Sequence, residues 1–137
     1  MTSSFFLGYV TETAANGLEA CQMMEAGEGS YDAILLDLHM PVMDGIEATR
    51  FIRTNLDKLI PILIISAEQG TVECFIMEKL IHFRVSLGDS KEAAVAAGAD
   101  GSLDKPAMAK DVISKMKVII AEKTALKAAA SAAEVNL

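Results

Sequence analysis

The chain has 137 residues, 52% hydrophobic and 23% charged, which is typical of a single globular domain and not of a disordered segment. The formal net charge of −7 disfavours nucleic acid as a partner, because that binding uses Lys and Arg to neutralise phosphates. No apolar run reaches the roughly 20 residues that span a membrane, and no signal-peptide pattern is present, so we expect a cytoplasmic protein with no membrane partner.

The region before residue 31 predicts one strand and one helix. Residues 9–14, YVTETA, alternate between apolar and polar, as a short strand does. Asn16-Gly17 is typical of a turn, and a helix is predicted over residues 18–26.

The middle of the chain predicts a buried strand followed by a loop and a helix. Residues 31–38, YDAILLDL, contain an almost unbroken apolar run, which indicates a strand buried on both faces. Pro41 and Gly45 bracket a loop, and residues 46–55 place apolar side chains at helical spacing.

The second half repeats the alternation of strand and helix. Residues 61–66, PILIIS, predict another buried strand, and residues 91–97 predict a helix that ends at Gly98. A strand over 101–104 leads to Lys105-Pro106, and the last helix is expected to start near Met108. The Ala-rich residues 125–133 could prolong that helix or fray.

Strands that alternate with helices predict an α/β fold, a doubly wound parallel sheet covered on both faces. In such sheets functional groups gather at the carboxyl ends of the strands, where Asp37, Ser66 and Lys105 fall. A carboxylate held there can attack a phosphoryl group or bind a metal, with the hydroxyl and the ammonium group contacting phosphoryl oxygens. The structural alternatives are an acid that caps a turn, a hydroxyl bonded to loop backbone, and a solvated lysine.

The segment YDAILLDLHMPVMDGIEATRFIR resembles the centre of response-regulator receiver domains, and its D-x-x-M-P-x-M-D-G core is specific to them. PILIISA, AAGADGSLDKP and GYVTETAANGLEA resemble other parts of the family, of the type attached to hybrid histidine kinases. The resemblance implies a flavodoxin-like fold in a two-component phosphorelay, with a histidine kinase or histidine phosphotransfer protein as partner. It also implies that Asp37 is the phosphoacceptor, assisted by Ser66 and Lys105, and that Mg²⁺ is held by Asp37 and the backbone carbonyl of His39.

Several other residues near the site or elsewhere in the chain are expected to have structural roles. Pro41, Asp44 and Gly45 would shape the loop beside the acceptor, with Asp44 as a turn former, and the Lys105-Pro106 bond could be cis. His82 has no partner at metal-ligand spacing. The two cysteines, Cys21 and Cys74, lack metal-site spacing and are expected to be free thiols.

The chain also departs from the family pattern. The expected first strand and its acidic pair are absent, since MTSSFFLGYV corresponds to the end of the family's first helix and the first acid is Glu12. We therefore expect weak Mg²⁺ binding, and an open sheet edge through which a homodimer could form. An extension covers about residues 71–88, and Ser102 occupies the position where the family usually has an aromatic.

These features divide the chain into a receiver-like domain over 1–120 and an Ala-rich helical tail over 121–137. The leading hypothesis is a receiver that is not an enzyme. The alternatives are a degenerate receiver that binds partners without phosphorylation, and a fragment of a hybrid histidine kinase. An aspartate-nucleophile phosphatase is disfavoured, because such enzymes generally need a second acid at the position of His39.

Overall fold

The computed structural model describes residues 4–6, 8–27, 31–67 and 90–135, and its centre is a parallel sheet. The sheet has the order β3-β4-β5, so β3 and β5 are its edges within the described part of the chain. Its strands are β3 (Ile34–Asp37), β4 (Ile62–Ala67) and β5 (Gly101–Lys105).

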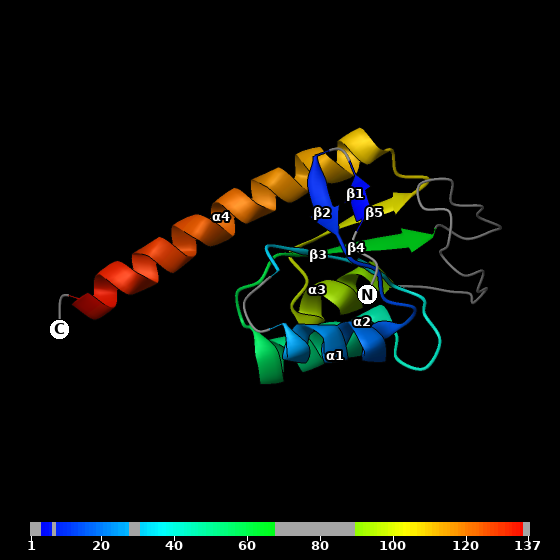
Figure 1. Ribbon diagram of the computed structural model, residues 1–137, viewed down its shortest axis with the longest axis horizontal. Helices are drawn as coiled ribbons and strands as arrows, with labels where there is room; N and C mark the ends of the chain where they lie inside the picture. The colour runs from blue at the N-terminus through cyan, green and yellow to red at the C-terminus, as the bar shows by residue number, and fades with distance from the viewer. Residues whose placement is uncertain (1–3, 7, 28–30, 68–89, 136–137) are drawn as a thin grey trace.

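Helices cover both faces of this sheet, which confirms the doubly wound α/β fold. Figure 1 shows helices below the sheet and a long helix above it. The lower helices are α1 (Gly17–Ala26), α2 (Gly45–Phe51) and α3 (Ser90–Ala97), and the upper one is α4 (Ala109–Val135). The main core lies between the sheet and the lower helices and contains Cys21, Leu36, Leu38, Ala48, Ile52, Ile62, Ile64 and Ala94.

The N-terminal residues form an antiparallel hairpin that is separate from the parallel sheet. It consists of β1 (Ser4–Phe6) and β2 (Tyr9–Thr11), and Gly8 in its turn has a φ of 87°, a conformation that glycine adopts without strain. The prediction that the N-terminus corresponds to a helix end was therefore wrong. The strand predicted over 9–14 is shorter than expected and pairs with β1, because aromatic and β-branched residues on both sides of Gly8 favour strands.

The first helix begins where the Asn16-Gly17 turn was predicted. Asn16 is the N-cap, and its side chain accepts a hydrogen bond of 2.9 Å from the backbone N–H of Glu19. A Cβ at Gly17 would lie 2.5 Å from the carbonyl oxygen of Met43, so only glycine allows α1 to approach the loop after β3 this closely.

The pKa of the Cys21 thiol in α1 is raised, mainly by burial and to a smaller extent by the negative charge of Glu25.

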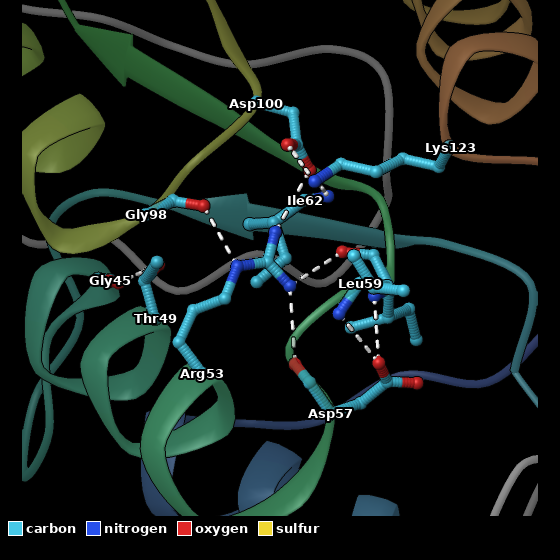
Figure 2. A network of polar contacts seen from close by, with 10 residues as sticks. Gly45, Thr49, Arg53, Asp57, Leu59, Ile62, Gly98, Asp100 and Lys123 are labelled. Atoms are coloured by element: carbon cyan, nitrogen blue, oxygen red, sulfur yellow. Dashed lines mark hydrogen bonds and ion pairs between the residues drawn. The ribbon is translucent and has the colours of Figure 1, made fainter. Parts of the chain in front are cut away.

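The helix predicted over 46–55 changes character halfway along. After α2 the chain forms a five-residue π-helical turn, Ile52–Leu56. The guanidinium group of Arg53, within this turn, donates to the carbonyl oxygens of Gly98 and Ile60 at 2.9 and 2.7 Å. It also contacts Oδ2 of Asp100 at 2.9 Å, while Oδ1 of Asp100 pairs with Lys123 of α4 (Figure 2).

The last helix continues without a break through the Ala-rich region, which therefore prolongs it. Ile119 is buried, whereas the described side chains from residue 124 onwards are exposed, and Figure 1 shows the C-terminal half of α4 extending beyond the sheet. The division into a domain over 1–120 and a tail over 121–137 stays a prediction. Among the helices that the structure describes, none is long and apolar enough to cross a bilayer.

Candidate functional site

Asp37 is the last residue of β3 and lies beside Lys105, the last residue of β5. The Nζ atom of Lys105 is 2.5 Å from Oδ2 of Asp37. Both side chains are mostly buried, with exposed fractions of 11% for the lysine and 15% for the aspartate. The structure thus brings two of the three predicted site residues into direct contact at the carboxyl edge of the sheet.

The second carboxylate oxygen of Asp37 is also engaged. Oδ1 accepts a hydrogen bond of 3.0 Å from the backbone N–H of His39, an interaction that fixes the direction of the carboxylate. Asp37 therefore presents a rigid, ionised group whose charge is balanced by one lysine.

Ser66 lies one position before the end of β4 and is 4% exposed. Its hydroxyl donates to Oδ1 of Asp104 at 3.4 Å, a residue that the sequence analysis did not single out. Asp104 could have been predicted to lie beside Ser66, because the two residues are near the ends of strands that were both predicted and that pair in parallel.

The loop after β3 is shaped as expected. Asp44 is the N-cap of α2, and its carboxylate and the side chain of Glu47 form a reciprocal capping box. A Cβ at Gly45 would lie 2.4 Å from the carbonyl oxygen of Asp37, so the loop can lie against the acceptor strand only if this residue is glycine. The Lys105-Pro106 bond is cis.

The described donor groups around Asp37 are fewer than tight binding of a divalent cation needs. Hard cations take six or more oxygen ligands, often from several carboxylates. Within the described ranges no three His, Cys, Asp or Glu side chains are grouped so that they could hold a metal ion. Both oxygens of Asp37 already have protein partners.

Some predictions fall outside the described residues. The extension at about 71–88, His82 and Cys74 lie within residues 68–89.

Ser102, by contrast, is a described residue of β5, where its carbonyl oxygen accepts a hydrogen bond of 2.6 Å from Lys115 of α4.

Comparison with known proteins agrees with this architecture. The family model of the response regulator receiver domain matches residues 4–80. The chain belongs to this family. Receiver domains are signalling modules of two-component systems, and in general they interact with histidine kinases or phosphotransfer proteins.

Among curated relatives, response regulator MprA of Mycobacterium ulcerans (strain Agy99) is 31% identical over 115 residues, which are 84% of this chain and 41% of MprA. The chain thus spans about two fifths of the length of this relative. A receiver domain protein from Clostridium thermocellum has the same fold, with a TM-score of 0.65, 21% identity, and coverage of 84% of this chain and 77% of the other.

Another similar structure, also of a receiver domain, contains a metal ion. The receiver domain of sensor histidine kinase PA1611 from Pseudomonas aeruginosa PAO1 has a magnesium ion coordinated in its active site cleft. It is 26% identical, with a TM-score of 0.54 and coverage of 79% of this chain and 74% of the other.

Proposed function

We propose that this receiver domain accepts a phosphoryl group on Asp37 from a phosphohistidine of a histidine kinase or histidine phosphotransfer protein. The observation that carries the proposal is the ion pair between Asp37 and Lys105 at the carboxyl edge of the sheet, with 2.5 Å between Oδ2 and Nζ. A carboxylate held on a rigid strand end can act as a nucleophile, and an adjacent ammonium group can offset the charge of the incoming phosphoryl group.

The transfer is a substitution at phosphorus with no change of oxidation state. A carboxylate oxygen of Asp37 forms the new O–P bond, and the P–N bond to the donor imidazole breaks. The imidazole keeps the electron pair and takes a proton from solvent. Lys105 turns its contact from the carboxylate to the phosphoryl oxygens, and Ser66 is the proposed hydroxyl donor to one of them.

We further propose that Mg²⁺ binds this chain weakly. The magnesium ion in the Pseudomonas receiver makes the cation relevant, but the described residues around Asp37 supply too few free oxygens for tight binding. Asp37 and the carbonyl of His39 are the groups that would contact a bound ion, which would neutralise phosphoryl charge.

The test is transfer of label from a radiolabelled histidine phosphotransfer protein. Wild-type protein should become labelled, Asp37→Asn should not, and Asp32→Asn should behave as wild type, because Asp32 is an exposed acid outside the site. The label should be released by hydroxylamine, as expected of an acyl phosphate. Equal labelling of wild type and Asp37→Asn would contradict the proposal.

A second candidate is a degenerate receiver that binds its partner without phosphorylation. It is favoured by the engagement of both Asp37 oxygens and by the poor fit to a cation. In that case the phosphotransfer protein would bind wild type and Asp37→Asn with equal affinity by calorimetry, and a Mg²⁺ titration would show no binding in the millimolar range. Clear Mg²⁺ binding that Asp37→Asn abolishes would exclude this candidate.

A further inference from the structure

The side chains of Ser66 and Asp104 lie next to each other at the carboxyl ends of neighbouring strands. The two residues are opposite each other in the parallel pairing of β4 and β5, so their side chains point to the same face of the sheet. The Ser66 hydroxyl is buried and donates to Oδ1 of Asp104, while Asp104 itself is exposed.

This hydrogen bond competes with the role proposed for Ser66. A hydroxyl has one proton to donate, so while Asp104 accepts it, a phosphoryl oxygen on Asp37 cannot. The distance of 3.4 Å is longer than the usual O–H···O range, so the bond is weak enough to exchange for a better acceptor. An ionised carboxylate only accepts hydrogen bonds, and therefore Asp104 has no means of replacing Ser66 as a donor to the phosphoryl group.

We propose that Asp104 is a positioning residue that holds the Ser66 hydroxyl away from Asp37 and thereby shortens the life of the phosphorylated state. The inference rests on the proposed function of Asp37. When the phosphorylated protein loses its label, water forms a bond to phosphorus, the bond from phosphorus to the Asp37 oxygen breaks, and inorganic phosphate leaves. A Ser66 hydroxyl free of Asp104 would bond the phosphoryl group in the ground state and slow this loss.

The experiment is a double-mutant cycle on the rate of label loss. Wild type, Asp104→Ala, Ser66→Ala and the double variant are labelled with radioactive acetyl phosphate, the donor is removed, and the decay is followed. Asp104→Ala should slow the decay by about two- to fivefold, the effect of one weak hydrogen bond. In the Ser66→Ala background the same substitution should leave the rate unchanged.

Asp104→Asn separates positioning from charge. It removes the negative charge but keeps an oxygen that can accept from Ser66, so its effect should be smaller than that of Asp104→Ala. Equal effects of the Asn and Ala variants, or an equal effect of Asp104→Ala with and without Ser66, would show that Asp104 acts through its charge alone and would overturn the inference.

Failure of the proposed function gives a different result. If none of the four proteins takes label at Asp37 while thermal unfolding shows all of them folded at the assay temperature, the proposed function is overturned and the inference with it. If label is present and the cycle is additive, only the inference is overturned.

Discussion

Substitution of Asp100 by Ala should be among the most destabilising single changes in the described part of the molecule. Asp100 lies at the amino end of the sheet, opposite the edge that carries Asp37. Its Oδ2 accepts from Arg53 and from the backbone N–H of Ile62, each at 2.9 Å, and its Oδ1 pairs with Lys123 at 2.8 Å. One carboxylate thus joins the π-helical turn Ile52–Leu56, β4 and α4 (Figure 2).

The expected cost follows from the groups that lose their partner. The N–H of Ile62, a residue with 0% exposure, would lose its acceptor, which costs about 1–3 kcal/mol. The Arg53 guanidinium, whose side chain is 13% exposed, would lose its counter-charge. Removal of one partner of such a buried pair typically costs about 3–5 kcal/mol, and this is the loss that we expect in the free energy of unfolding.

The assay is urea unfolding followed by circular dichroism. The difference in the free energy of unfolding is taken from the urea midpoints of variants whose slopes of free energy against urea are equal. Lys123→Met is the matched control, because it keeps most of the aliphatic chain of Lys123 and leaves Asp100 bonded to Arg53 and to the N–H of Ile62. It should therefore cost less than Asp100→Ala. Asp100→Asn keeps an acceptor for Ile62 and should fall between the two. An Asp100→Ala variant that loses no more stability than Lys123→Met would refute the reasoning.

Three further predictions follow from local features. Val42 has a φ of 69° and is 77% exposed, so Val42→Asn should raise the unfolding free energy by about 1 kcal/mol in urea, and a loss of stability would contradict this account. The pKa of Tyr31 is raised above 10.0, chiefly by the hydrogen bond that its hydroxyl donates to Glu12 and then by burial and by the charge of Glu12. The contribution of this hydrogen bond to stability should therefore be complete below about pH 10 and be lost as the pH rises further. Tyr31→Phe should flatten the decline in the free energy of unfolding measured from pH 8 upwards. An unchanged decline would contradict this account. The edge strand β3 exposes 39% of Leu35, so the predicted homodimer should be detected by sedimentation and be weakened by Leu35→Lys, whereas a wild-type monomer at high concentration would exclude it.

The parts of the fold that the sequence predicts correctly have strong local patterns. The apolar runs before Asp37 and Ser66 each specify a strand, and parallel strands bring their carboxyl ends to one edge. The predicted burial on both faces is found in β4 but is wrong for β3, an edge strand in which Leu35 is 39% exposed. The contact between Asp37 and Lys105, which are far apart in sequence, follows from that geometry. Asp44 was predicted to form a turn and is the N-cap of α2, in a capping box with Glu47 that the prediction did not include.

The parts that the sequence does not predict depend on partners distant in the chain. Alternation over 9–14 indicates a strand but not which strand it pairs with, and the antiparallel pairing with Ser4–Phe6 is decided by the short turn at Gly8. The contacts of Arg53 depend on a π-helical turn for which the local sequence has no distinct pattern. Asp104 was missed because its role depends on the register between β4 and β5 and not on a motif.

The charges at the carboxyl edge of the sheet explain why Ser66 matters for the proposed function. Lys105 balances the Asp37 carboxylate in a one-to-one ion pair. A phosphoryl group would add about two negative charges at neutral pH, so one lysine would no longer neutralise the site. Hydrogen-bond donors that are already in place stabilise such added charge. Among the predicted site residues, Ser66 is the hydroxyl that can do so, and its present bond to Asp104 makes the stability of the phosphorylated state depend on how readily that bond exchanges.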